Sequence, residues 1–567
     1  MNLFNRFPRK LRPVLQFLGL FSLCFLLVVS CSNPPATTRS NTDRIIIGTT
    51  LKVRTVDPAD AYELASGNLL YNLGDRLYSY APGTTQLVPQ LATELPQVSK
   101  DNLTYIIPLR QGVKFHDGTA FNAEAMSFSL RRFIENEGPP SFLLGDVVES
   151  IQATGEYELT IKLKQPFAAF PALLAFSGAC AVSPQAYEIG SGKFRPNSFV
   201  GTGPYKLAEF GTDIIRLDVF DEYWGSKPQN PGIDMQIFSS SANLFNAFRT
   251  GAIDVAAGSL DSDQIKALVS QAPKTGWQQI TTDSNTLNYI VVNVNSPPLD
   301  KLEVRQALAA IIDRQILNQR VLQNQAQPAY SLIPTSFDVY KPVFQTEYGD
   351  GNAAKAKALL QKAGYSQANP AIIELWYASN STKRGVIAST IKAIADQKMD
   401  EMMQLELHSV ESTTAFDNLD KGVYPTFLLD WYADFFDPDN YIQPFMDCDR
   451  GSAIAGCQTG ASQYHGSFYY NDRVNELIDQ QRQEANPEKR QAMLIEIQEI
   501  MAEEVPFIPL WLDKDYIFAQ KRISGATIEP TQQFPYYSMK KTSGRSFACP
   551  RKPIAFAIIF HTRPEAE

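Results

Sequence analysis

Short apolar runs alternate along most of the chain with stretches whose apolar residues recur every three or four positions. The run Ile45-Ile46-Ile47 predicts a buried strand, and the spacing over Leu64 to Leu77 predicts a helix. Asn122 is the predicted N-cap of another helix, and Ile151 to Leu163 alternates about Gly155 as a hairpin does. Further helices are predicted for Val304 to Ile316, Ala353 to Ala363 and Pro487 to Met501. Strands that alternate with helices over a whole chain favour an α/β architecture with substantial sheets.

The stretch Thr426 to Phe445, TFLLDWYADFFDPDNYIQPF, sets carboxylates among large aromatic side chains directly after an apolar run. Phe427 to Leu429 predicts a buried strand, and it is followed by Asp430, Asp434, Asp437 and Asp439. Burying a carboxylate between aromatic groups is costly unless a cation meets it, so this loop predicts the wall of a cation-binding site. A solvated acidic turn closed by Asp437-Pro438-Asp439 is the alternative.

The first 30 residues have the features of a signal peptide. They contain no acidic residue, carry four basic ones near the start, and continue into the apolar run Val14 to Val29. That run is shorter than the ~20 residues that a spanning helix needs, so a permanent membrane span is the weaker alternative. Val28-Val29-Ser30-Cys31 resembles the lipobox of bacterial lipoproteins, in which the cysteine becomes the lipidated first residue of the mature protein. Residues 1–30 are therefore predicted to be removed, Cys31 to be a lipid anchor, and residues 31–43 to form that anchor and a flexible tether.

The length of the chain indicates several domains, and its negative charge argues against a nucleic-acid partner. A chain of 567 residues implies roughly two to four domains, and 44% hydrophobic residues is the composition of an ordinary globular protein. The net charge is −9, and losing the four basic residues of 1–30 takes it to −13. An acidic, membrane-anchored protein is a poor nucleic-acid binder, because that binding depends on clustered Lys and Arg that neutralise phosphates.

The cysteines fit an oxidising compartment. Cys24 leaves with the signal peptide, and Cys448 and Cys457 flank a glycine-containing loop in an exported chain, which predicts a disulfide. A zinc site with the nearby His465 is the alternative, but the pattern lacks the close C-x-x-C spacing and a second pair of ligands.

Common enzyme motifs are absent from the sequence, which has no G-x-S-x-G, no H-E-x-x-H and no G-x-x-x-x-G-K-[ST]. We therefore expect no catalytic residue and no enzyme activity. The best enzyme alternative is a secreted glycoside hydrolase that uses Asp430 and Asp434 as paired carboxylates. A calcium loop over Asp434, Asp437 and Asp439 would lack the glycine and the distal glutamate that such loops need.

Several longer segments resemble one protein family, in that family's order. They are LRQGVKFHDGTAFNAEAMSFSLRR from Leu109, GTGPY from Gly201 with the later YWG from Tyr223, NAFRTGAIDVA from Asn246, VNVNSPPLDKLEVRQALAAIIDR from Val292 and WYADFFDPDNY from Trp431. These segments resemble the solute-binding proteins (family 5) that serve bacterial peptide and nickel ABC importers. The resemblance runs from about Ile45 to about Met539.

The resemblance implies a two-lobe fold of the periplasmic-binding-protein type (type II), with a hinge of crossover strands and an additional domain inserted in the first lobe. On that template the first lobe is 44–66 with 199–285 and 505–540, the inserted domain is 67–198, and the second lobe is 286–504. Residues 541–567 fall outside the resemblance and are expected to be an atypical extension. A ligand that touches both lobes would stabilise the closed state, which the importer then recognises.

The resemblance also implies ligand-binding residues. In peptide-binding relatives the Asp of the W-x-[AG]-D segment meets the α-ammonium of the peptide, and Trp431-Tyr432-Ala433-Asp434 occupies that position. Arg384 lies where dipeptide binders carry an arginine that reads the carboxylate, and Tyr62 and Glu63 correspond to ligand-lining positions near the first crossover. Phe435 and Phe436 depart from the smaller or polar residues of some relatives, which leaves the preferred peptide open.

The expected partners follow from the same resemblance. They are a peptide-like ligand, the permease subunits of an ABC importer, and the membrane through the lipid on Cys31, with the protein a monomer outside the cytoplasm. No cofactor and no metal is expected. A nickel or other metal-complex binder of the same family is the alternative.

Overall fold

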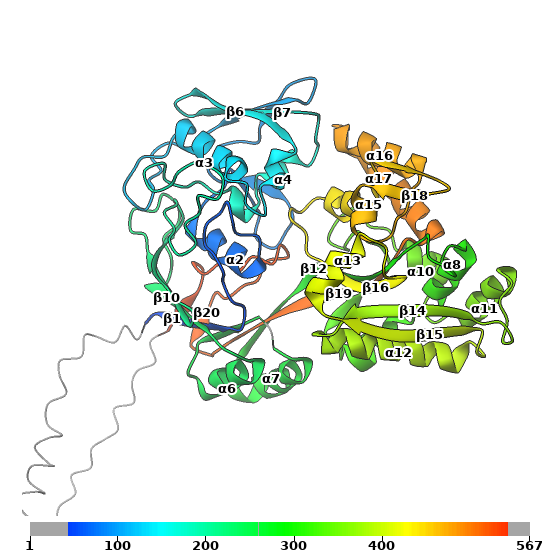
Figure 1. Cartoon of the computed structure of the whole chain (residues 1–567). Coiled ribbons are helices and arrows are strands. Elements are labelled where there is room, and N and C mark those ends of the chain that lie inside the picture. The colour runs from blue at the N-terminus through cyan, green and yellow to red at the C-terminus, as the bar shows by residue number, and fades with distance from the viewer. Residues whose placement is uncertain (1–42, 259, 543–567) are drawn as a thin grey trace, which may run out of the picture. The chain divides into compact units, whose positions relative to one another are not determined.

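The computed structural model describes residues 43–258 and 260–542 (Figure 1). The predicted signal peptide, the anchor Cys31, residues 31–42 of the tether and residues 543–567 of the extension lie outside the described residues. All described strands and helices belong to one compact unit that begins at Ile45. Strands alternate with helices through it, so the predicted α/β class is confirmed. No helix in the described ranges is long and apolar enough to cross a membrane.

One large mixed sheet organises this unit. Its strand order is β15-β14-β16-β12-β19-β11-β1-β10-β9-β8, and β13 pairs with β19 off this path. β12 and β19 pair antiparallel almost along their whole length, from Gln278 opposite Ala519 to Val291 opposite Phe507. In this order the strands are β15 (Met403–Val410), β14 (Ala371–Ala378), β16 (Thr426–Trp431), β12 (Gln278–Val292), β19 (Phe507–Ala519), β11 (Val255–Ala257), β1 (Ile45–Thr49), β10 (Gly232–Ile237), β9 (Ile214–Val219), β8 (Tyr205–Phe210) and, off the path, β13 (Ala326–Pro328).

Two hydrophobic cores share β12 and β19. Leu287 and Leu512 belong to a core with β14, β15 and β16, which is the core of the second lobe. Ile517 and Ala519 belong to a core with β1, β9 and β10, which is the core of the first lobe. The pairing register of β12 shifts between Asp283 and Leu287, at the passage from one core to the other. β12 and β19 are therefore crossover strands between two lobes, a feature that the family resemblance implied.

The segment after α2 (Leu64–Leu73) forms a further core of its own. It contains a four-stranded antiparallel sheet in the order β4-β5-β7-β6, against which α3 packs. Asn122 caps α3 by accepting a hydrogen bond of 3.0 Å from the backbone N–H of Ala125, which confirms the predicted start of the helix. The elements are β2 (Tyr78–Tyr80), β3 (Leu87–Pro89), β4 (Gln97–Val98), β5 (Thr104–Pro108), α3 (Ala123–Glu135), α4 (Phe142–Gly145), β6 (Val148–Gly155), β7 (Glu158–Leu163), α5 (Phe170–Leu173) and η2 (Ser177–Ala179). We propose that this segment makes up most of the inserted domain 67–198, with the lobe boundaries as the family resemblance implies, although Leu69, Leu70 and Leu73 of α2 pack in the core of the first lobe.

The remaining helices cover the large sheet and the second lobe (Figure 1). Two predicted helix ends are wrong. The helix expected to reach Leu77 stops at Leu73, where Gly74 is the C-cap. The helix expected to reach Ile316 stops at Ile311, because Asp313 caps a new short helix by accepting a hydrogen bond from the backbone N–H of Ile316. The elements are α6 (Ser241–Thr250), α7 (Ser262–Thr275), α8 (Leu302–Ile311), α9 (Arg314–Ile316), η3 (Leu317–Val321), α10 (Val343–Tyr348), α11 (Ala353–Lys362), α12 (Thr382–Lys398), α13 (Ser412–Leu419), η4 (Pro438–Tyr441), α14 (Gln443–Met446), β17 (Arg450–Ser452), β18 (Gly456–Thr459), α15 (Ala461–Tyr464), α16 (Asp472–Gln483), α17 (Pro487–Glu504), β20 (Ile523–Ser524) and β21 (Lys540–Lys541).

Candidate functional site

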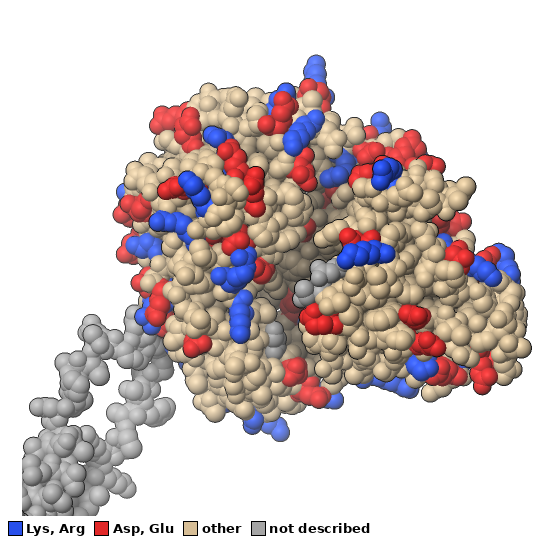
Figure 2. Space-filling view, viewed as in Figure 1, with Lys and Arg blue, Asp and Glu red and all other residues tan. Residues whose placement is uncertain are grey.

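A cavity of about 480 Å³ lies where β19 passes between the lobes. Its walls come from β1, α2 and the start of α7 on the first-lobe side, and from β13 and the start of α12 on the second-lobe side. Figure 2 shows this face of the molecule hollowed between the part that carries α2 and α3 and the part that carries β16. A volume within ~300–1,000 Å³ is typical of sites that enclose small molecules.

A smaller cavity of about 70 Å³ adjoins the first. Tyr62 and Glu63 line it from the segment before α2, and residues 432–436 line it from the loop after β16. Two segments that lie about 370 residues apart and that the sequence predicted to bind ligand therefore meet at one place. The residues that line both cavities are Leu64, Asn68 and Gln532.

Aromatic contacts with the inserted domain hold the loop 432–436. Phe435 is only 6% exposed and belongs to the core of that domain, with its ring centroid 6.0 Å from that of Phe167. The ring of Phe436 lies 5.5 Å from that of Tyr80, whose hydroxyl oxygen accepts a hydrogen bond from the backbone N–H of Phe436. These two residues, which the sequence singled out as unusual, fix the backbone on the C-terminal side of Asp434.

The Asp434 carboxylate lies at the junction of the two segments. The hydroxyl of Tyr62 donates a hydrogen bond of 2.7 Å to its Oδ1, and the backbone N–H of Asp434 donates one of 2.9 Å to the side chain of Asn440. Burial raises the pKa of Asp434, although hydrogen bonds with Tyr62 and Asn440 act in the opposite direction. Within residues 43–258 and 260–542 no cation forms an ion pair with it, so the charge of Asp434 is unbalanced by the protein.

Trp431 and Tyr432 have different surroundings. Tyr432 lines the small cavity and is 38% exposed. Trp431 packs against Phe445 and His465, with ring distances of 5.3 and 5.4 Å, and its buried Nε1 has no hydrogen-bond partner in the described part of the chain. Of the two predicted ligand residues, Tyr432 therefore lies at the cavity, and Trp431 belongs to the packing of the second lobe.

Glu63 differs from Asp434 in having a cationic partner. Its Oε1 accepts a hydrogen bond of 2.5 Å from Nε of Arg54. Partial burial acts to raise the pKa of Glu63, but the hydrogen bond and charge of Arg54 outweigh it and lower the pKa. Glu63 is therefore an anion that is already balanced, and we infer that its role is to hold the segment before α2 in place.

Arg384 and its neighbour Lys383 point to different partners. The guanidinium of Arg384 forms an ion pair with Asp430 of β16. Lys383 lines the large cavity, where its Nζ lies 3.5 Å from Oδ1 of Asp513, and its side chain is half exposed. The cation that lines the cavity is thus Lys383, the residue before the predicted Arg384.

Two carboxylates of β19 that the sequence did not single out also line the cavity. Asp513 accepts hydrogen bonds from the indole N–H of Trp511 at 3.0 Å and from the Asn288 amide at 3.2 Å. Asp515, two residues on, accepts a hydrogen bond of 3.2 Å from the amide of Gln532. Burial raises the pKa of Asp515 to about 6, and the charge of Asp513 acts in the same direction. Asp513 and Asp515 are two residues apart on one strand, so both carboxylates lie on the same face. This spacing is the only feature of the sequence that indicates them.

The geometry bears on two alternatives from the sequence. A glycoside hydrolase would need Asp430 and Asp434 to flank one substrate, but Asp430 pairs with Arg384 and lines neither cavity, whereas Asp434 contacts Tyr62. For a metal site, the described ranges contain no group of three or more His, Cys, Asp or Glu side chains that could hold an ion.

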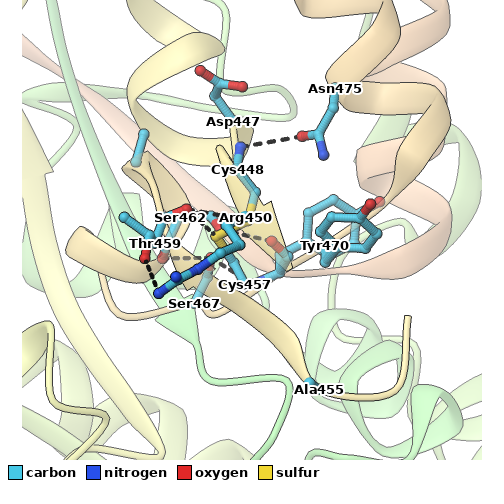
Figure 3. The surroundings of a disulfide bond; sticks show 12 residues. Asp447, Cys448, Arg450, Ala455, Cys457, Thr459, Ser462, Ser467, Tyr470 and Asn475 are labelled. Atoms are coloured by element: carbon cyan, nitrogen blue, oxygen red, sulfur yellow. Dashed lines mark hydrogen bonds between the residues drawn. A yellow bond between two sulfur atoms is a disulfide. The ribbon is translucent and has the colours of Figure 1, made fainter. Parts of the chain in front are cut away.

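A disulfide joins Cys448 to Cys457 (Figure 3). It closes the hairpin of β17 and β18, and the amide of Asn475 on α16 accepts a hydrogen bond of 3.1 Å from the backbone N–H of Cys448. Cys180 is free and buried elsewhere. The bridge therefore ties a short surface hairpin to the second lobe.

Replacing both bridged cysteines by serine should lower the free energy of unfolding by about 2–3 kcal/mol, because a short cross-linked loop gains freedom in the unfolded chain. Chemical denaturation of the wild type with and without reductant should give the same difference, and the double variant should not respond to reductant. Non-reducing peptide mapping of the exported protein that found two free thiols would reject the bridge.

The chain is similar to a known protein family and to individual members of it. The family described as bacterial extracellular solute-binding proteins, family 5 Middle, matches residues 86–453. The chain is 27% identical over 502 residues to the glutathione-binding protein GsiB of Salmonella typhi, which covers 87% of this chain and 93% of that protein. It is 26% identical over 489 residues to di/tripeptide-binding protein 2 of Pseudomonas aeruginosa (strain UCBPP-PA14), which covers 82% and 88%.

Solved structures share the fold. The substrate-binding protein CtaP of Listeria monocytogenes superposes with a TM-score of 0.76 at 21% identity, covering 88% of this chain and 99% of CtaP. NikA of Brucella suis, solved in complex with Fe(III)-EDTA, gives a TM-score of 0.76 at 19% identity, covering 88% and 100%. Two lobes, crossover strands and a cavity between them define the periplasmic-binding-protein fold. The chain belongs to the bacterial extracellular solute-binding proteins of family 5.

Proposed function

We propose that this protein is the lipid-anchored substrate-binding component of an ABC importer, that it is a monomer without enzyme activity, and that it captures a short peptide-like ligand between its lobes. The observation that carries the proposal is Asp434, a buried carboxylate with no cationic partner among the described residues, at a cavity with walls from both lobes. A peptide's α-ammonium would supply the missing charge. The names of the relatives that bind glutathione and di- or tripeptides support this ligand class.

Ligand capture would shift the balance between open and closed forms. Tyr62 precedes α2 on the first-lobe side, and Asp434 follows β16 of the second lobe, so a cation placed beside their hydrogen bond would interact with both lobes at once. A ligand with contacts to both lobes stabilises only the form in which they are close. The closed form would then deliver its ligand to the permease.

The ligand class is tested by native mass spectrometry of the purified, exported protein. The proposal predicts that masses of short peptides are released on denaturation of the chain. Release of a metal complex or a sugar in place of peptides would contradict it and would favour one of the two alternatives drawn from the sequence.

The carboxylate end of the ligand would be read by the cations at the start of α12. We propose that Lys383, which lines the cavity, makes the contact, and that Arg384, which lines neither cavity, holds the start of α12 beside β16 through its pairing with Asp430. Lys383→Ala should weaken binding of a free peptide by up to about fivefold, since a half-exposed ion pair is worth at most about 1 kcal/mol. The same substitution should leave binding of the peptide's C-terminal amide unchanged.

The neighbouring variant Arg384→Ala is the matched control for this measurement by isothermal titration calorimetry. A larger loss for Arg384→Ala than for Lys383→Ala, again confined to the free carboxylate, would assign the contact to Arg384, as the resemblance first implied. Equal losses for free and amidated peptides would reject both residues as carboxylate readers.

Anchoring is a separate part of the proposal and rests on the sequence around Ser30-Cys31. Cys31→Ala should move the protein out of the membrane fraction or leave it unprocessed, because the lipid is attached to that thiol. Metabolic labelling with a fatty acid, followed by fractionation, makes the comparison. Absence of label in the wild type would refute the anchor without bearing on ligand binding.

A further inference from the structure

Acidic side chains outnumber basic ones among the residues that line the two cavities. The cations are Lys383 and Lys514, and the anions are Glu63, Asp261, Asp434, Asp513 and Asp515. Three ion pairs already involve these charges: Lys383 with Asp513, Glu63 with Arg54, and Lys514 with Asp283. Asp261 accepts a hydrogen bond from the hydroxyl of Ser241. Asp261, Asp434 and Asp515 form no ion pair within the described chain, and of these three Asp261 is exposed, whereas burial raises the pKa of Asp434 and of Asp515.

Asp515 receives hydrogen bonds from neutral groups only. The Gln532 amide donates a hydrogen bond of 3.2 Å to Oδ2 of Asp515. It donates another of 2.8 Å to the hydroxyl oxygen of Thr286, which lies beside the register shift in β12. Gln532 is 7% exposed and has a φ of 57°, a conformation that non-glycine residues seldom adopt, so the surrounding structure holds this donor firmly. The charge of Asp513, on the same strand face, adds to the negative potential at Asp515.

Tyr432 lies within electrostatic reach of both Asp515 and Asp434. The charges of both Asp515 and Asp434 act on its hydroxyl, and the ring lines the small cavity. An aromatic ring near two carboxylates is a favourable environment for an ammonium or guanidinium group. Thr531 lines the same cavity, is 1% exposed, and its hydroxyl oxygen has no hydrogen-bond partner among the described residues. A buried acceptor without a donor is the second sign that a ligand N–H belongs here.

We propose that the two adjoining cavities together take a peptide with two cationic groups, its α-ammonium at Asp434 in the smaller cavity and a lysine or arginine side chain at Asp515 in the larger one. This inference rests on the proposed function, because it assumes that Asp434 holds the α-ammonium. It adds a substrate class, basic short peptides, and a residue, Asp515, that selects them. A neutral peptide would leave the charge of Asp515 unbalanced and would bind more weakly.

The test compares alanyl-lysyl-alanine with alanyl-norleucyl-alanine, which has the same main chain and nearly the same side-chain length without the ammonium group. By isothermal titration calorimetry at pH 7, the lysine peptide should bind the wild type about tenfold or more tightly. Asp515→Asn should remove this preference and leave the affinity for the norleucine peptide within about twofold. Asp283→Asn, a change to an exposed acid of β12 that pairs with Lys514, is the matched control and should keep the preference.

A second readout uses only the wild type. The charged or titratable groups around Asp515 are Asp513, Lys383 and Tyr432, and burial raises the pKa of Asp515 itself to about 6. The ratio of the two affinities should therefore rise between pH 5 and pH 7 as Asp515 ionises, whereas the α-ammonium contact at Asp434 is common to both peptides and cancels. Equal affinities for the two peptides at both pH values would overturn this inference and leave the proposed function standing. Binding of neither peptide would overturn both.

Discussion

Arg132→Ala should lower the free energy of unfolding by about 3–5 kcal/mol, because it leaves Asp57 as a buried charge without its partner. The guanidinium of Arg132 meets Asp57 through two parallel bonds of 2.8 and 2.7 Å, and the two side chains are 1% and 0% exposed. The backbone N–H groups of Ala59 and Arg195 also donate to this carboxylate. The pair joins the segment after β1 to α3, so its loss should loosen the contact of the inserted domain with the first lobe.

The neighbouring residue supplies the control. Arg131 pairs with Glu135 one turn along α3, with both side chains nearly half exposed, so Arg131→Ala should cost less than about 1 kcal/mol. Urea denaturation of the two variants, followed by circular dichroism, measures the difference. If the two arginine variants were equally stable, the buried pair would not be the tie between these parts of the chain.

Asp434→Asn should weaken binding of a peptide by at least about a hundredfold. The substitution removes the charge that faces the ligand's α-ammonium and strands that ammonium in an enclosed site, which costs about 3–5 kcal/mol, whereas loss of a pair at an exposed rim would cost under about 1 kcal/mol. Asn keeps an oxygen that can accept the hydrogen bond from Tyr62, so the geometry of the loop should survive. Stability without ligand should not fall, since burial penalises the charged form of Asp434 in the empty protein.

Asp430→Asn is the matched control for Asp434→Asn, because it changes the same residue type at the end of the same strand. Asp430 is half exposed and pairs with Arg384, outside the lining of the two cavities. Binding should therefore change by less than about tenfold. A loss as large in Asp430→Asn as in Asp434→Asn would show that the effect comes from the strand end rather than from a contact with the ligand.

Local features of the fold could be predicted because neighbouring residues determine them. Asn122 lies three residues before the N–H that it caps, and the apolar run of Phe427 to Leu429 needs only burial to become a strand. The helix end at Ile311 was missed because the apolar spacing continues to Ile316, although the cap at Asp313 was present in the sequence. Where a capping residue interrupts a regular apolar spacing, the two local features predict different helix ends, and the spacing alone does not show which of them the chain follows.

The site was predictable only where a motif carried it. Asp434 and Tyr62 were found through the resemblance, and they meet although they lie far apart in the sequence. The surroundings of Asp515 are set by the register shift in β12 and by a hydrogen bond from Gln532. Neither can be predicted from the residues next to Asp515 in the sequence. The pairing of Arg384 with Asp430 likewise depends on how α12 packs beside β16, so sequence position alone favoured Arg384 over Lys383 at the cavity.

The amine contact at Asp434 is tested by isothermal titration calorimetry of one short peptide, free and N-acetylated, with the wild type and with Asp434→Asn. Acetylation removes the α-ammonium and keeps the rest of the ligand. We expect acetylation to weaken binding to the wild type by at least about a hundredfold and to have little further effect on the Asp434→Asn variant, because the two changes remove the same charge pair. Equal affinity of the wild type for the free and the acetylated peptide would contradict an amine anchor at Asp434.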